Sequence, residues 1–125
     1  MKVSLGENSK LVVNPSERDQ IRKFYQDVLG CPVTKESERI DIFKIGSTFY
    51  LGVMYGDSAL SKEDYLKSIW LELRTENPDE LKNKILDFGI TEIEYWDKEH
   101  FYFQAPGGQV FRLTDSKEDM SKWQH

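Results

Sequence analysis

The first clear pattern in the chain is a helical repeat of apolar side chains after Pro15. One stripe has the i, i+3, i+4, i+7, i+8 spacing of an amphipathic helix: Ile21, Phe24, Tyr25, Val28 and Leu29. Ser16 is the predicted N-cap, and Gly30 stands where helices commonly end in a left-handed conformation. The pattern therefore predicts a helix over about residues 16–29.

Segments rich in β-branched and aromatic residues surround this helix and then return later in the chain. Strands are expected at 11–13, 32–35, 39–45 and 47–54, and in the second half at 68–75, 91–96, 101–104 and 110–114. A second helix is expected to begin at Pro78 and end at Gly89. Gly30 and Gly89 are 59 residues apart, and the turn glycines Gly46 and Gly107 are 61 apart. This near-constant offset indicates an internal duplication.

The repeated order predicts an α+β fold of two βαβββ modules in tandem. Module one covers about 9–54, a linker 55–67, module two about 68–115, and a polar tail 116–125. Each helix is expected to cover one face of its mixed or antiparallel sheet, on the outside. The opposite faces of the two sheets are then free to form a cup.

Size and composition indicate one ordinary domain and exclude several classes of partner. The chain has 125 residues, a net charge of −5 and no basic tract, so generic nucleic-acid binding is not expected. No apolar run approaches the roughly 18–20 residues of a membrane span, so no membrane association is expected either. Cys31 is the only cysteine, which prevents an intrachain disulfide and favours a cytoplasmic location.

Three short motifs at the ends of these elements resemble a known superfamily. They are Phe24-Tyr25 with Val28-Leu29-Gly30, then Pro106-Gly107-Gly108, then Phe111-Arg112-Leu113. The order resembles the glyoxalase/bleomycin-resistance/extradiol-dioxygenase superfamily, the vicinal oxygen chelate fold, over about Lys10 to Thr114. The resemblance implies a pocket between two modules, often completed by a homodimer. It leaves the reaction open, because members include metal-dependent isomerases, lyases and dioxygenases as well as metal-free proteins that sequester antibiotics.

The resemblance also implies four metal-ligand positions, on the first and last strands of each module. Alignment to the predicted strands puts them at Lys10, Leu51, Trp70 and Arg112. Protonated amines and guanidinium groups offer no lone pair to a cation, and leucine and tryptophan have no suitable donor. A shift of register by one or two residues brings in Glu72 or Gln109 but no complete ligand set, and neither histidine lies on a predicted ligand strand. No metal and no other cofactor is therefore expected.

Strand alternation predicts which side chains face the cup. Residues at 69, 71 and 73 are apolar and should pack under the helix, so the residues between them point the other way. The same reasoning on the other strands gives the candidate ligand-binding set: Lys10, Phe49, Leu51, Trp70, Glu72, Arg74 and Arg112. Glu72 and Arg112 are expected to be neighbours, because the first and last strands of a module lie side by side in the superfamily.

For several residues the sequence leaves two roles open. Arg112 and Glu72 form either a half-buried ion pair or, with Lys10, an anchor for an anionic ligand. Trp70 is either a stacking wall or plain core. His100 has the pKa of a general base but is expected at the surface, beside a hairpin. The C-terminal Trp123 is expected at most to cover an edge.

Three functions are compatible with these residues. The favoured one is a metal-independent protein that encloses a small organic ligand in the cup, as a homodimer. The alternative is a metal-dependent lyase, isomerase or dioxygenase with an atypical ligand set. The third is a structural or regulatory homodimer whose cup is merely core. The sequence names no ligand and no reaction.

Overall fold

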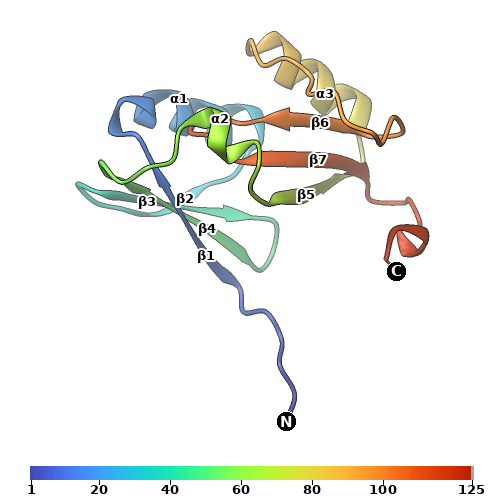
Figure 1. The fold of residues 1–125 in the computed structure, drawn as a ribbon, viewed down its shortest axis with the longest axis horizontal. Helices are drawn as coiled ribbons and strands as arrows, with labels where there is room; N and C mark the ends of the chain where they lie inside the picture. Colours follow the sequence, from blue (N-terminus) through green and yellow to red (C-terminus); the bar gives the residue numbers. More distant parts are fainter. Residues whose placement is uncertain (125) are drawn as a thin grey trace.

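The structure is a computed structural model that describes residues 1–124, and His125, the end of the expected polar tail, lies outside them. Its first half is a four-stranded sheet, called sheet A, with the strand order β1-β4-β3-β2 (Figure 1). The strands are β1 (Asn8–Val13), β2 (Val33–Glu36), β3 (Ile40–Ile45) and β4 (Phe49–Tyr55). β1 runs parallel to β4, and the other neighbours are antiparallel.

The second half is a three-stranded sheet, called sheet B, with the order β5-β7-β6. Its strands are β5 (Trp70–Thr75), β6 (Phe101–Gln104) and β7 (Val110–Asp115), and α3 (Pro78–Asp87) lies between β5 and β6 in the chain. The short α2 (Lys62–Tyr65) joins the two halves, and the 3₁₀ turn η3 (Ser121–Trp123) lies near the C-terminus. The predicted α+β class is confirmed, and the second half repeats the element order of the first with one strand fewer.

One predicted strand does not form. Residues 91–96 make a single bridge, Glu92 to Phe103, and one further bond from the Ile93 amide to the Tyr102 carbonyl. After Ile93 the chain leaves the edge of β6. The carboxylate of Asp97 accepts a hydrogen bond from the Tyr102 hydroxyl, which holds the following loop over the sheet instead of beside it.

The first helix begins earlier than predicted and changes its pitch. Asn14, not Ser16, is its cap: the Asn14 side chain accepts the Ser16 amide. A 3₁₀ turn η1 (Pro15–Glu17) leads into α1 (Arg18–Arg22), and the π-helical η2 (Lys23–Val28) follows. The proline at the first helical position explains the shift, because it needs no hydrogen-bond acceptor and leaves the cap to the residue before it.

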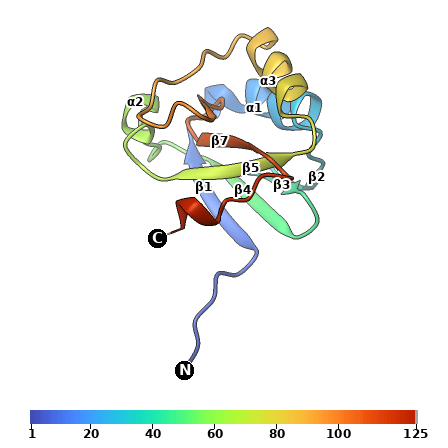
Figure 2. The same cartoon turned by 90° about the vertical axis from the view of Figure 1, so that its right-hand side faces the viewer.

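The aromatic side chains of η2 join the two sheets into one core. Phe24 lies 5.8 Å from the ring of Phe103 in sheet B, and Tyr25 stacks on Phe43 of sheet A at 4.9 Å and contacts Phe111 of sheet B at 6.2 Å. All five rings are buried. In Figures 1 and 2, α1 and α3 lie above the sheets, so each sheet keeps one face that no helix covers. Within residues 1–124, no helix combines the length and the apolar character that crossing a membrane requires.

Candidate functional site

The open face of sheet B carries a row of polar and aromatic side chains in register. Glu72 of β5 pairs with Arg112 of β7, and Tyr102 of β6 pairs with Arg112 on its other side. Trp70 stands two residues before Glu72 on the same face. The predicted alternation holds within β5 and β7, and so does the expected contact between Glu72 and Arg112. Ile69, which was expected to pack under the helix, lies before the start of β5 and is 67 % exposed.

Arg112 is the centre of this row. Its side chain is only 9 % exposed, and its Nη2 donates to Glu72 Oε1 at 2.5 Å. The guanidinium carbon lies 4.3 Å from the ring centre of Trp70 and 5.7 Å from that of Trp123. Burial lowers the pKa of Arg112, but its interactions with Glu72 and Tyr102 together outweigh burial and hold the pKa above its usual value. Arg112 is thus a permanent cation between two indole rings.

His100 lies beside this cluster and is buried, contrary to the surface position expected from the sequence. Its side chain is 4 % exposed. Nδ1 lies 2.7 Å from Asp97 Oδ2, and Nε2 lies 2.9 Å from both carboxylate oxygens of Glu118. Because the two ring nitrogens contact different carboxylates, His100 has no free nitrogen to act as a base on a ligand.

The three residues Asp97, His100 and Glu118 hold the C-terminal segment on sheet B. Glu118 belongs to the tail, which crosses the face of the sheet opposite α3 (Figures 1 and 2). Arg74 adds to the attachment by donating to the backbone carbonyls of Asp115 and Glu118. Met120 is consequently buried. The tail is therefore part of the site. Its docking could not be predicted from local sequence patterns, because Glu118 is 18 residues from His100 in the chain.

We expect this attachment to make stability fall as the pH rises. Burial lowers the pKa of His100, but the bonds to Asp97 and Glu118 outweigh it and raise the pKa above 6.5. The imidazolium therefore stabilises the fold fully below about pH 6.5, and this stabilisation disappears as the pH rises through the raised value. Urea unfolding between about pH 6 and about pH 9 should show a falling free energy of unfolding for the wild type and a flatter profile for His100→Gln. Equal slopes for the two proteins contradict the assignment.

The open face of sheet A differs from the prediction. Lys10 pairs with Gly52 and Val12 with Met54, and these four residues share the open face. Leu51 is on the opposite side, where it packs in the core with Leu11 and Val13.

The same register places Phe49 on the core side, opposite Ile45, so the predicted cup positions of Phe49 and Leu51 are wrong. Every residue of the segment Phe49–Tyr55 except Gly52 is apolar or aromatic. Alternation therefore carried no information about its faces, and a shift of one residue moves all side chains to the other face.

A groove between the two sheets brings Phe49 close to two other predicted residues. It is an apolar cavity of about 400 Å³. Its lining comes from the end of the β3–β4 hairpin and from β5 and β7: Ile45, Gly46, Phe49, Leu71, Glu72, Leu73, Arg74 and Phe111. The predicted site residues are thus divided among three places: Lys10 on sheet A, Phe49 with Glu72 and Arg74 at this groove, and Trp70 with Glu72 beside Arg112. Leu51 belongs to the core.

Solved structures with this arrangement of modules share its fold. A fosfomycin resistance protein, FosX, from Listeria monocytogenes complexed with Mn(II) and sulfate superposes with a TM-score of 0.72 at 19 % identity, covering 100 % of both chains. A putative glyoxalase family protein from Bacillus anthracis has a TM-score of 0.72 at 16 % identity, covering 94 % of this chain and 98 % of its own. The chain therefore has the fold of these glyoxalase and fosfomycin resistance proteins.

A further solved structure has the same fold, whereas comparisons of the sequence identify no related protein. Lactoylglutathione lyase from Agrobacterium tumefaciens has a TM-score of 0.66 at 16 % identity over 93 % of this chain and 96 % of its own. No protein-family model and no curated protein matches the sequence.

The residues at the superfamily's ligand positions do not fit a divalent metal. Gly52 pairs with Lys10 and Glu72 pairs with Arg112, so Gly52 and Glu72 stand where Leu51 and Trp70 were expected from the sequence. Only Glu72 carries a metal-binding oxygen, and it is paired with Arg112. Among residues 1–124, no group of three His, Cys, Asp or Glu side chains is placed to hold a metal ion. His100 and its two carboxylates do not form one, because the carboxylates lie on opposite sides of the ring.

Proposed function

We propose that this protein is a metal-independent small-molecule binding protein of the glyoxalase/bleomycin-resistance type. The ligand binds on the face of sheet B opposite α3, at the border of the docked tail, with Arg112 as its polar anchor and Trp70 as an apolar wall. The ligand class is a small organic acid, or a molecule with an equivalent acceptor oxygen, attached to an aromatic or apolar group. With one cysteine and no disulfide, we place the protein in the cytoplasm.

Two buried donors without acceptors carry this proposal. Among residues 1–124, four buried side-chain polar atoms make no hydrogen bond, and two of them, Arg112 Nε and Trp123 Nε1, lie in this site. Leaving a buried donor unpaired costs about 1–3 kcal/mol, so such groups are normally satisfied. The two belong to one cluster, because the guanidinium lies over the Trp123 ring. A carboxylate or phosphate can accept from both N–H groups, and Trp70 provides area for an attached ring.

Arg112 already pairs with one carboxylate, that of Glu72, so an acidic ligand can bind by taking the place of this carboxylate. Glu72 is exposed at its outer side, while Arg112 is held by the indole rings, so an incoming anion can displace the Glu72 carboxylate without moving Arg112. The long-range field opposes an anion, since the net charge is −5. Affinity must therefore come from the local contacts, and it should depend strongly on Arg112.

Replacing Arg112 with glutamine is expected to weaken acid binding by about 10- to 100-fold, because a hydrogen bond to a charged group contributes about 1.5–3 kcal/mol. Isothermal titration calorimetry with benzoate, phenyl phosphate and acetate measures this directly, and both aromatic acids should bind more tightly than acetate. Lys98→Gln is the matched control, since Lys98 is an exposed cation in the neighbouring loop. Equal affinity for Arg112→Gln and the wild type, or no binding of any of the acids, contradicts the proposal.

The metal-dependent alternative is favoured by one observation, the similarity to FosX complexed with Mn(II). Elemental analysis of the purified protein separates the two functions. We expect no stoichiometric metal, and acid binding that is unchanged by a chelator. A stoichiometric metal that is lost in Glu72→Gln would establish the alternative, because Glu72 is the one open-face ligand among the four strand positions.

A further inference from the structure

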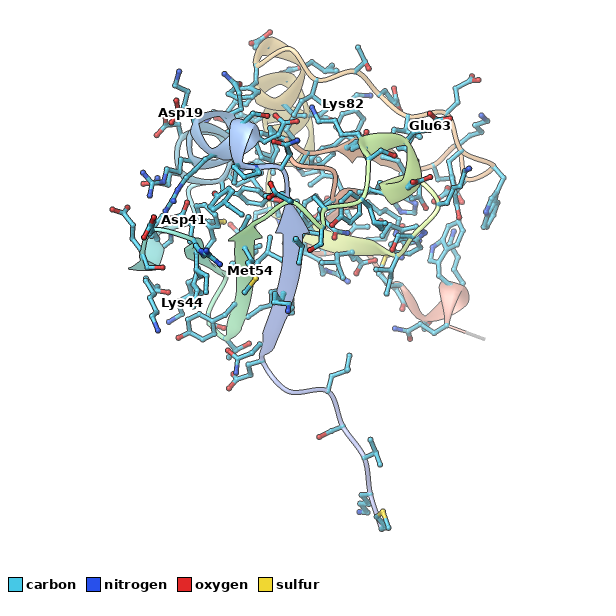
Figure 3. The ribbon with its side chains drawn as sticks, turned by 60° about the vertical axis from the view of Figure 1, so that its left-hand side comes forward. Asp19, Asp41, Lys44, Met54, Glu63 and Lys82 are labelled. Carbon is cyan, nitrogen blue, oxygen red and sulfur yellow. The ribbon has the colours of Figure 1, made fainter. Side chains whose placement is uncertain are left out.

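The N-terminal segment, residues 1–7, is an extended arm that projects from the body. Figures 1, 2 and 3 all show it leaving the start of β1 and pointing away from the rest of the chain. Its last residue keeps one bond to sheet A, from the Tyr50 amide to the Glu7 carbonyl. Its apolar side chains alternate with polar ones, and Met1, Val3 and Leu5 are 117, 89 and 99 % exposed. This is the pattern of a strand with one face intended for burial.

Sheet B has an edge of matching character. β5 is the end strand of the order β5-β7-β6, so its outer backbone groups face no other strand. Folded proteins usually protect such edges. Here the edge borders the 400 Å³ apolar groove, to which Leu71 and Leu73 of β5 and Phe49 of β4 contribute. A free edge beside an apolar groove is the arrangement that binds an added strand, with backbone bonds for affinity and pockets for alternate side chains.

The arm and the edge fit in length and spacing. Seven extended residues span about 23 Å, and the six residues of β5 span about 20 Å. Side chains two residues apart on the arm, such as Val3 and Leu5, point to the same side and can enter one groove. The arm extends from the start of β1 and heads away from sheet B (Figures 1 and 2). The β5 edge that it can reach therefore belongs to another molecule.

We propose that two copies of this chain exchange their N-terminal arms. Residues 1–7 of each copy add to the outer edge of β5 in the other, and Val3 and Leu5 enter the groove between Phe49, Leu71 and Leu73. The exchange is reciprocal, so it closes as a two-fold dimer and covers both free edges. It also places the arm beside Trp70 and Glu72 at the border of the ligand site. The exchange is independent of the ligand and of its identity.

The test compares two neighbouring positions on the arm. Sedimentation velocity of the full chain should give a dimer of twice 14.7 kDa. Leu5→Asp should raise the dimer dissociation constant at least tenfold, because it puts a carboxylate into an apolar groove. Ser4→Asp adds the same charge one residue away, on the other face of the arm, and should leave the constant within about twofold. Both side chains are exposed in the single chain, so neither change should disturb folding, which circular dichroism verifies.

Hydrogen exchange then identifies the surface. Amides of β5 and of residues 2–6 should be protected in the wild type at dimer-forming concentration and should exchange faster in Leu5→Asp. A wild type that stays monomeric overturns the proposal. So does a dimer that Leu5→Asp leaves intact, or one whose β5 and arm amides exchange as they do in the monomer. Acid binding is measured separately, so failure of the dimer leaves the Arg112 proposal standing, and the reverse also holds.

Discussion

Replacing Asp41 with alanine is expected to lower the free energy of unfolding by about 3 kcal/mol. The Asp41 side chain is fully buried in sheet A, facing α1 (Figure 3). It accepts hydrogen bonds from Arg18 at 3.1 Å, from Arg22 at 2.9 and 3.0 Å, and from the Tyr55 hydroxyl at 2.7 Å. Removing the carboxylate takes away the anion that both guanidinium groups share; Arg22 keeps the exposed carboxylate of Glu36, at 3.0 Å, and Arg18 keeps two backbone carbonyls. The estimate is at the low end for a buried pair, because both arginines are partly exposed.

The pH dependence of this effect provides its check. Burial raises the pKa of Asp41, but the bonds from Arg22, Tyr55 and Arg18 outweigh it and hold the pKa below its usual value of 3.8. The stabilisation is therefore complete above pH 3.8 and disappears as the pH falls through the lowered value. Urea unfolding should show the full difference between wild type and Asp41→Ala at neutral pH and a smaller one in strong acid. Asp27→Ala, at an exposed carboxylate of η2, should change stability by less than about 0.5 kcal/mol.

The second large effect is expected at Gly108, in the turn before β7. Its φ is +125°, a conformation that other residues rarely adopt. A Cβ at this position would lie 2.4 Å from Cδ2 of the Tyr65 ring. The Tyr65 hydroxyl donates to the Val12 carbonyl, so moving the ring also detaches α2 from β1. We expect Gly108→Ala to cost about 3 kcal/mol, from backbone strain and overpacking together.

Gly46→Ala separates the two contributions. Gly46 also has a positive φ, of 76°, but a Cβ there would meet nothing within 4 Å. Its substitution should cost only the backbone strain, about 1 kcal/mol. Thermal or urea unfolding of both variants measures the difference. Equal losses would mean that the Tyr65 ring moves aside freely and that the contact at Gly108 carries no strain.

Part of the ligand site could be predicted from the alternation of polar and apolar residues along single strands. On β5 the polar and apolar residues alternate, and on β7 Phe111 and Leu113 flank Arg112. Only one orientation buries the leucines and the phenylalanine, so the contact of Glu72 with Arg112 could be predicted. The residues of β4 do not alternate between polar and apolar, and the prediction of which side chains face the core was wrong for this strand. Sequence alternation identifies a face only where one face is polar.

The remainder of the site depends on contacts between distant segments. Asp97, His100 and Glu118 come from a loop and a tail with no regular period, and Trp123 reaches Arg112 only because Glu118 is held by His100. The Asp41 network likewise joins a strand to residues about 20 positions earlier in the chain. A charged residue in a polar segment looks the same in sequence whether it is solvated or buried.

By itself, the sequence determined the α+β class, the repeated order of elements, the first helix, and the glycines that end helices and form turns. Gly30, Gly46, Gly89 and Gly107 all adopt positive φ. These features depend on the conformational preferences of a few neighbouring residues, and such preferences are local. Only the tertiary structure decided which face of β4 is buried, that residues 91–96 leave the sheet, and that His100 and the tail cover the face where Arg112 lies. Those outcomes depend on burial and on pairing of charges across the fold, and both are set by the packing of segments that are far apart in the chain.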